Sequence, residues 1–223
     1  MESPWDRPDT VAGFTRTPPN ADLLHFAERE LRRAGLGRAL DLGCGAGRNA
    51  LPLARQGWRV LAVDLSEPML QEMVRRVREE GRERECHIAR CAMDSLPVRN
   101  HSCDLLVAHG IWNLARSGAE FRTAVREAGR VARAGAGLFV FTFSRTTLPD
   151  EARPIENESF VFTEFAGVPQ CFLSVDQLID ELGRERFVPD ASVPLVELNR
   201  RPRGALGPGR VPVIHQGAFR YTG

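Results

Sequence analysis

The stretch ALDLGCGAGRNA, residues 39–50, places three glycines within five residues, directly after an apolar run that contains an aspartate. The apolar run is typical of a buried β-strand, and the glycines predict a turn whose backbone can approach a ligand closely. Dinucleotide-binding enzymes use such a turn with the spacing G-x-G-x-x-G. Gly43 and Gly45 fit that spacing, but Arg48 stands at the third glycine position, which argues against a dehydrogenase.

Helical and strand-like segments alternate on both sides of this turn. Asn20 and Ser66 each stand before a segment with apolar residues at helical spacing, as capping residues do. The strand-like segments are short and apolar, as expected when both faces of a sheet are covered. The predicted helices are 21–35, 49–56, 67–80 and 120–133, and the predicted strands are 38–42, 58–64, 86–90, 104–110 and 138–143. This order predicts a parallel sheet with helices on both faces.

The C-terminal third of the chain has a different pattern. Ser174 and Gln177 form a capping box at the start of a helix over 174–183. Two strand-like runs, 193–199 and 211–221, flank a loop rich in Arg, Gly and Pro, and they predict an antiparallel β-hairpin at the sheet edge. All elements together predict an α/β fold with a doubly wound, mostly parallel, seven-stranded Rossmann-like sheet that ends in this hairpin.

Length and composition predict a single domain over 1–223. The chain is 43% hydrophobic and 26% charged, an ordinary mix for a globular protein of 223 residues. Residues 1–19 are rich in proline and charge and predict an N-terminal arm or lid. The long segment 144–172 predicts an insertion that caps the substrate, because loops of this length are usually functional or have structure of their own.

Charge and cysteine content restrict the partners that we expect. The net charge of +1 provides no basic field for nucleic acid, and no apolar run approaches the roughly 20 residues that span a bilayer. The polar, acidic N-terminus does not resemble a secretory signal. Five cysteines without a C-x-x-C pair predict reduced thiols rather than disulfides or a zinc site. We expect a cytoplasmic monomer or homodimer without metal, nucleic-acid or membrane partners.

Two carboxylates extend the pattern around the glycine turn. Asp41 completes the spacing D-x-G-x-G-x-G, and Asp64 stands at the end of the next predicted strand. In sheets of this type a carboxylate there accepts both ribose hydroxyls of a bound nucleoside. The chain resembles the class I S-adenosylmethionine-dependent methyltransferases, with this spacing as motif I and DLLVAHGIWNL, residues 104–114, as motif IV. The resemblance implies the class I methyltransferase fold and S-adenosyl-L-methionine as cofactor.

The resemblance also implies particular cofactor contacts. The glycine turn wraps the amino-acid moiety and the ribose, and Leu65 packs on the adenine. An acidic residue after the third strand meets the adenine amine in this family; its usual position is Ala92, so either Asp94 substitutes or the Met93 backbone acts alone. We place Arg16 on the cofactor carboxylate, with a solvated arm charge as the alternative. The complete set is Arg16, Asp41, Gly43, Cys44, Gly45, Gly47, Asn49, Asp64, Leu65, Met93, Asp94 and His109.

Further segments resemble the tellurite-resistance and thiopurine methyltransferases. Residues 15–17 read TRT, as in the segment before the first helix of that group, and Arg48 and Asn49 complete its GRN motif. That group has E-L-H-R near its C-terminus, whereas Asn199 replaces the histidine here. The similarity covers residues 12–145, and the replaced histidine argues against an oxyanion as the methyl acceptor.

We expect methyl transfer to a small-molecule acceptor. In-line displacement from a sulfonium releases a neutral leaving group, so alignment of the reactants carries most of the catalysis. A base is needed only where the nucleophile must lose a proton. The catalytic candidates are His109 and Arg200, the acceptor-contact candidates are Trp112, Phe160, Phe162 and Glu164, and further candidates for an anionic acceptor are Arg201 and Arg203. Each of these residues also fits an ordinary structural role.

Three other functions are compatible with parts of the sequence. Amino-methylating nucleic-acid enzymes carry [DNS]-P-P-[YFW] after the fourth strand, but residues 108–111 read AHGI. A protein methyltransferase and a non-catalytic S-adenosylmethionine-binding protein remain alternatives to the small-molecule enzyme. The intact glycine turn and Asp64 argue against the non-catalytic alternative, which a closed acceptor pocket would favour.

Overall fold

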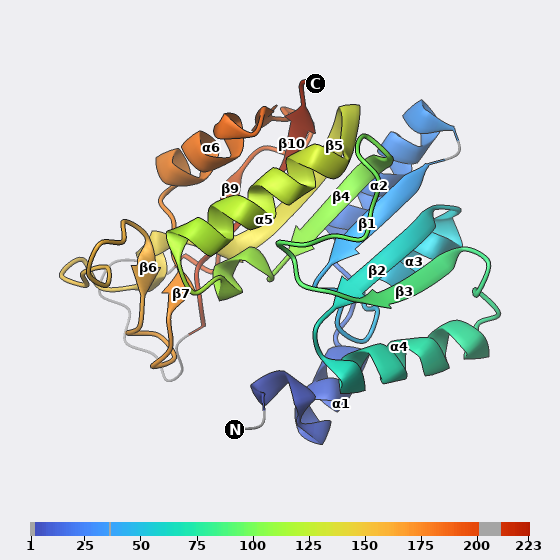
Figure 1. The fold of residues 1–223 in the computed structure, drawn as a ribbon, viewed down its shortest axis with the longest axis horizontal. Coiled ribbons are helices and arrows are strands. Elements are labelled where there is room, and N and C mark those ends of the chain that lie inside the picture. Colours follow the sequence, from blue (N-terminus) through green and yellow to red (C-terminus); the bar gives the residue numbers. More distant parts are fainter. Residues whose placement is uncertain (1–2, 36, 201–210) are drawn as a thin grey trace.

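The computed structural model describes residues 3–35, 37–200 and 211–223. Its centre is a sheet with the strand order β3-β2-β1-β4-β5-β10-β8, and β9 also pairs with β10 (Figure 1). The parallel strands are β1 (Arg38–Leu42), β2 (Arg59–Asp64), β3 (Cys86–Arg90), β4 (Cys103–His109) and β5 (Ala132–Phe143). The antiparallel part consists of β10 (Ile214–Tyr221) with β8 (Phe187–Pro189) and β9 (Val196–Leu198). The predicted doubly wound sheet with a terminal hairpin is confirmed.

The two faces of the sheet are covered by different helices. Helices α2 (Ala21–Ala34), α3 (Ala50–Gln56) and α4 (Glu67–Glu79) pack on one face through a cluster that contains Phe26, Trp58 and Phe139. Helices α5 (Gly118–Val131) and α6 (Val175–Arg184) cover the other face around Phe121 and Phe219. Successive side chains of a strand point to opposite faces of the sheet, so they pack into two separate hydrophobic cores.

Several predicted helix ends have the expected caps. The Asn20 side chain accepts a hydrogen bond from Leu23 N at 3.0 Å, and Ser66 Oγ accepts one from Met69 N at 3.4 Å. The capping box of Ser174 and Gln177 has both of its reciprocal bonds. These side chains bond backbone groups that the first helical turn leaves without partners.

The structure contains elements that the sequence pattern did not predict. Within the arm, η1 (Pro4–Asp6) and α1 (Pro8–Arg16) form helices, and a proline at the first helical position favours such a start. Strand β5 begins at Ala132, whereas the sequence pattern predicted a start at 138. The prediction missed the first residues, ARAGAG, because they carry no bulky apolar side chain that would indicate a strand. Short 3-10 helices, η2 (Trp112–Leu114) and η3 (Arg145–Thr147), follow β4 and β5.

Segment 144–172 has structure of its own. Strands β6 (Val161–Phe162) and β7 (Gln170–Cys171) form a two-stranded antiparallel sheet. Phe162 and Phe172 are buried in a small cluster with the half-buried Phe143 and Phe165. This cluster adjoins the end of β5, so the segment is anchored to the sheet where the parallel strands end. In the described part of the chain no helix combines the length and apolarity that a membrane crossing requires.

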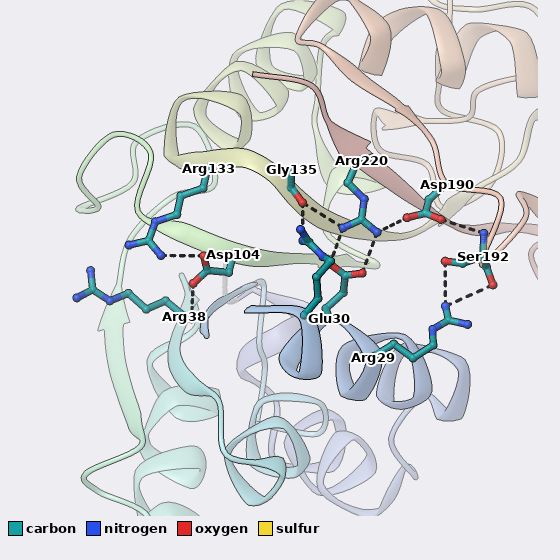
Figure 2. Close-up of polar contacts among 10 residues, drawn as sticks. Arg29, Glu30, Arg38, Asp104, Arg133, Gly135, Asp190, Ser192 and Arg220 are labelled. Carbon is teal, nitrogen blue, oxygen red and sulfur yellow. Dashed lines mark hydrogen bonds and ion pairs between the residues drawn. The ribbon is translucent and has the colours of Figure 1, made fainter. Parts of the chain in front are cut away.

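An ion-pair network joins the first helix on the sheet to the C-terminal strand (Figure 2). Glu30 on α2 accepts hydrogen bonds at 2.8 Å from both Arg33 and Arg220, and Arg220 also pairs with Asp190. The Glu30 carboxylate is 7% exposed. Burial alone would raise the pKa of Glu30, but the Arg220 and Arg33 guanidiniums outweigh it and hold the pKa below its ordinary value. The ionised form of Glu30 therefore stabilises the docking of α2 on β10.

We predict that Glu30→Gln lowers the free energy of unfolding by about 2 kcal/mol, because it removes a largely buried carboxylate that accepts hydrogen bonds from charged donors. Urea unfolding followed by circular dichroism measures this change. Glu28→Gln is the matched control, since Glu28 pairs with Arg32 on the exposed side of the same helix and should contribute less than about 1 kcal/mol. Equal losses in the two variants would contradict a special role for the network.

Candidate functional site

The glycine turn lies at the edge of the sheet where the parallel strands end. Gly43, Gly45 and Gly47 all have positive φ angles, of 65°, 52° and 80°. Side chains with a Cβ rarely adopt this conformation, so the turn requires glycine at all three positions. It follows β1 directly, and α3 begins three residues after its last glycine.

Asp64, at the end of β2, holds the turn in place. Its Oδ2 accepts a hydrogen bond from Gly45 N at 2.8 Å, and its Oδ1 accepts one from Ser66 N at 2.9 Å. The carboxylate thus spans the glycine turn and the start of α4. Leu65, the next residue, is 60% exposed, so its apolar side chain is available to pack against a ligand beside Asp64.

The N-terminal arm covers the glycine turn. A Cβ on Gly45 would lie 3.5 Å from the Phe14 ring of α1, and Phe14 in turn contacts Trp5 edge-to-face. Ser66 Oγ donates a hydrogen bond to Asp6 at 2.7 Å. The arm therefore packs over the turn and the start of α4, a position that suits the lid expected from the sequence; its role as a lid stays a prediction.

Asp41 provides a buried carboxylate behind the turn. It is 1% exposed, and its Oδ2 has no hydrogen-bond partner among the described residues. The pKa of Asp41 is raised to about 7: burial is the main cause and Asp64 adds to it, while Arg48 and the Ala50 amide act in the opposite direction. A buried carboxylate with a free oxygen attracts a cation or a hydrogen-bond donor from a ligand.

His109, the last residue of β4, joins the turn to the opposite side of the site. Arg48 Nη2 lies 2.9 Å from His109 Nδ1, and Asn20 Nδ2 lies 3.3 Å from His109 Nε2. The imidazole stacks on Phe141 with a centroid distance of 4.0 Å. Burial and then the Arg48 guanidinium lower the pKa of His109 to about 3. The ring is neutral near pH 7, and a pKa this low makes it a weak base, so it suits hydrogen bonding better than proton abstraction.

The other predicted cofactor contacts lie around this centre to different extents. Met93 and Asp94 are half-buried in the loop after β3, and Asn49 Oδ1 accepts a hydrogen bond from Asn20 N at 3.2 Å. Cys44 is buried, and its burial raises the thiol pKa well above its ordinary value, as for an inert packing residue. Arg16 is exposed at the end of α1. Their contacts with a cofactor stay predictions.

The predicted acceptor residues are mostly packed against one another. Trp112 and Phe160 are at most 1% exposed, and both contact Phe121. Phe162 is buried with Arg145 over its ring, and Glu164 accepts a hydrogen bond from Thr163 N at 3.0 Å. These placements leave their acceptor role as a prediction.

Arg200 is the C-terminal arginine candidate that the structure describes, and it lies two residues after β9. Arg200 is 71% exposed and pairs with Glu197 at 3.4 Å. Asn199, where the related group has histidine, adopts a φ of 62°, which asparagine tolerates better than most residues. Arg201, Arg203 and most of the predicted loop 200–210 lie outside the described residues. The catalytic role of Arg200 stays a prediction.

Sequence reasoning did not identify several residues of this site. Asn20 was read only as a helix cap, Gln216 only as part of a strand, and Phe14 only as part of the arm. The sequence gives Arg48 a place in the GRN motif and in the argument against a dehydrogenase, but no contact within the site, although it directly follows the third glycine. Gln216 and Asn20 are 196 residues apart in sequence, yet their side chains form a hydrogen bond of 2.6 Å, which no local pattern indicates.

An open groove of about 650 Å³ lies away from this site, between α4 and β3. Its polar lining consists largely of charged side chains that pair with one another, such as Arg75 with Glu72 and Glu79 and Arg90 with Glu67. Among the described residues no three His, Cys, Asp or Glu side chains gather as a metal site would require. The candidate site is therefore the glycine turn and its surroundings.

The residues at the turn fit S-adenosylmethionine. The turn has the open backbone that a close-lying ligand needs, Asp41 offers an unpaired oxygen to an ammonium or sulfonium compound, and Asp64 with Leu65 offers a carboxylate beside an apolar surface. Asp41 and Gly45 would hold the amino-acid part, and Asp64 would hold the ribose. Bound S-adenosylmethionine supplies an electrophilic methyl group on its sulfonium sulfur.

Comparisons with known proteins agree with this fit. Residues 39–135 match the family described as Methyltransferase domain. The chain is 35% identical over 205 residues to the ubiquinone/menaquinone biosynthesis C-methyltransferase UbiE of Syntrophotalea carbinolica. The aligned region covers 82% of this chain and 78% of that protein.

Solved structures share the fold. An S-adenosylmethionine-dependent methyltransferase from Methanosarcina mazei superimposes with a TM-score of 0.70 at 19% identity, over 91% of this chain and 98% of that one. The 1,6-didemethyltoxoflavin-N1-methyltransferase of Burkholderia thailandensis, solved with its acceptor and S-adenosylhomocysteine, superimposes with a TM-score of 0.65 at 18% identity, over 100% and 94%. With these relatives and this site, the chain belongs to the class I S-adenosylmethionine-dependent methyltransferases.

Proposed function

We propose that this methyltransferase methylates a small, ring-containing acceptor that binds between the C-terminal edge of the parallel strands and segment 144–172. The observation that carries the proposal is a set of buried polar atoms around this edge that have no hydrogen-bond partner among residues 3–35, 37–200 and 211–223. Trp112 Nε1 and Asn113 Oδ1 on η2, and Gln170 Oε1 on β7, belong to this set. Such atoms are costly to bury alone, by about 1–3 kcal/mol each, and a polar ligand would satisfy them.

The contacts between these elements support a common binding region. Cys171 Sγ on β7 lies 3.4 Å from the Ala115 carbonyl that follows η2, so the insertion packs directly against the segment after β4. Phe143 at the end of β5 contacts Phe165 and Phe172 with centroid distances of 5.4 and 5.2 Å. Aromatic faces beside polar atoms suit a flat ring that carries hydroxyl, carbonyl or amine groups.

The names of two relatives support the same class of acceptor. One is a C-methyltransferase of ubiquinone and menaquinone biosynthesis, and the other methylates N1 of a toxoflavin precursor. We extend to this chain only the shared feature of a small ring acceptor. Residues 15–17 and the GRN motif support a second, narrower proposal, that the chain is a member of the tellurite-resistance and thiopurine group.

The protein contributes alignment rather than strong base catalysis. Burial and then the Arg48 guanidinium lower the pKa of His109 to about 3, so its imidazole is a weak base, and a proton on the acceptor would leave to solvent or be lost before transfer. An acceptor that ionises readily, such as a phenol, an enol or a thiol, meets this condition. Alignment of nucleophile, methyl carbon and sulfur then supplies most of the rate enhancement.

An assay of S-adenosylhomocysteine release tests the proposal. Phenols and hydroquinones, ring amines, thiols, tellurite, selenite and an oligonucleotide are each incubated with the protein and S-adenosylmethionine, with Asp64→Ala as the inactive control. We expect release with a ring compound at least about tenfold above the rate without acceptor, as alignment in a binding site readily supplies. Release that occurs only with the oligonucleotide, or with none of the ring compounds, would contradict it.

Asp64→Ala should weaken S-adenosylhomocysteine binding by about tenfold or more, equivalent to about 1.4 kcal/mol. The variant removes the proposed ribose contact and the hydrogen bond to Gly45 N that holds the turn. Isothermal titration calorimetry measures the dissociation constant. Asp180→Ala, the same change on the exposed side of α6, is the control and should bind like the wild type. Unchanged binding by Asp64→Ala would place the ribose elsewhere.

Cofactor affinity should fall as the pH is lowered through 7. The free protein holds the Asp41 pKa at about 7, and a bound ammonium favours the ionised carboxylate, so binding below pH 7 requires loss of a proton. The dissociation constant of S-adenosylhomocysteine should then rise toward a limiting slope of about tenfold per pH unit. Calorimetry between pH 5.5 and 8.5 measures this, and Asp41→Asn should flatten the profile; a flat wild-type profile would refute the role of Asp41.

A further inference from the structure

Both ring nitrogens of His109 face hydrogen-bond donors. Arg48 Nη2 lies 2.9 Å from Nδ1, and Asn20 Nδ2 lies 3.3 Å from Nε2. A neutral imidazole has one acceptor nitrogen and one N–H, whereas an imidazolium has two N–H groups. The neutral ring can therefore accept from Arg48 or from Asn20 but not from both, and the protonated ring can accept from neither.

The orientation of the Asn20 amide is fixed from two directions. Its Oδ1 accepts the capping hydrogen bond from Leu23 N, and its Nδ2 donates to Gln216 Oε1 at 2.6 Å. Gln216 is fixed in turn, because its Nε2 donates to Asp22 Oδ2 at 2.6 Å. Reversing the Asn20 amide would cost both the cap and this chain of bonds, so Asn20 presents an N–H group to His109.

Arg48 is the donor that can find a better partner. If His109 accepts from Asn20, the Arg48 guanidinium faces the Nδ1–H group, and two donors meet. If His109 accepts from Arg48, the same mismatch of two donors arises between Asn20 and the Nε2–H group. Arg48 is half-buried, and its guanidinium lies 6.0 Å from the Phe14 ring of the arm. A partly buried guanidinium whose hydrogen bond creates a mismatch elsewhere is suited to an anionic ligand.

Asp41 and Arg48 are close in space but do not neutralise each other by contact. Each influences the pKa of the other, yet Asp41 Oδ2 has no hydrogen-bond partner and Arg48 Nη2 points to His109. The site thus offers a carboxylate and a guanidinium that lie beside the glycine turn without bonding each other. An α-amino acid carries an ammonium and a carboxylate on one carbon atom, and it complements such a pair.

We propose that Arg48 binds the α-carboxylate of the cofactor's methionine part, while Asp41 faces its α-ammonium. This inference rests on the cofactor position at the glycine turn described above. When Arg48 turns to the carboxylate, His109 becomes free to accept from Asn20 without a mismatch. Arg48 rather than the exposed Arg16 then anchors the carboxylate, and it acts as a positioning residue for the methyl group.

A pair of ligands that differ only in the carboxylate tests this assignment. S-adenosylhomocysteine carries the group, and its decarboxylated counterpart, S-adenosyl-3-thiopropylamine, does not. Calorimetry at pH 8 with both ligands is performed on the wild type, Arg48→Gln and Arg48→Lys. Arg55→Gln is the matched control, since Arg55 lies on α3, the helix that follows Arg48, and is exposed and paired with Glu80; Arg16→Gln tests the alternative anchor.

We expect Arg48→Gln to weaken S-adenosylhomocysteine binding by about tenfold or more and to leave binding of the decarboxylated ligand nearly unchanged. Arg48→Lys should lose less, because it keeps the charge without the bidentate geometry. Equal losses for both ligands, no loss for either, or a carboxylate-specific loss in Arg16→Gln instead would overturn the assignment. A wild type that binds neither ligand would refute the cofactor position itself.

Nitrogen NMR of the His109 ring in the wild type gives a test that needs no Arg48 variant to fold. The ring signals are assigned by their absence in His109→Gln. In the free protein Arg48 is the closer donor, at 2.9 Å from Nδ1 against 3.3 Å from Asn20 to Nε2, so we expect Nδ1 to accept and Nε2 to carry the proton. S-adenosylhomocysteine should shift the tautomer toward Nδ1–H, because Arg48 leaves Nδ1 and Nε2 then accepts from Asn20. The decarboxylated ligand should leave the tautomer as in the free protein. The same tautomer in all three states would overturn the proposed exchange of partners.

Discussion

The turn after β1 depends on one conformational constraint: three residues within five must adopt positive φ angles. Glycine meets this constraint at little steric cost, and the bond from Gly45 N to Asp64 then fixes the turn against the neighbouring strand. All other parts of the site are positioned relative to it. Asp41 is the penultimate residue of β1, which leads into the turn, Arg48 follows the third glycine, and His109 is the last residue of β4.

The C-terminal edge of the parallel strands gathers polar groups that the folded chain does not satisfy by itself. Asp41 Oδ2 is one of them, and the buried atoms of Trp112, Asn113 and Gln170 are others. At the opposite end of the sheet, Glu30, Arg220 and Asp190 satisfy one another (Figure 2). That network stabilises the fold, whereas the polar groups at the C-terminal edge are suited to bind ligands.

Local patterns predicted the parts of this protein that depend on neighbouring residues in sequence. The helix caps at Asn20 and Ser66, the capping box at Ser174 and the glycine turn each follow from a few adjacent residues, and the structure contains all of them. Strand β8 and the start of β5 were missed because they are short or lack bulky apolar residues. The bond of Asn20 to Gln216 and the approach of Arg48 to His109 depend on tertiary packing, so composition and spacing carry no signal for them.

The packing of Phe14 over Gly45 has a consequence for ligand exchange. A compound that needs the exposed face of Gly45 competes with the aromatic ring for the same space. The free energy that docks the arm, including the contact of Trp5 with Phe14 and the bond of Ser66 to Asp6, is then subtracted from the observed affinity. For a ligand that binds at that face, residues 3–17 would act as an internal competitor, and the rate at which this segment detaches would set an upper limit on how fast the ligand exchanges.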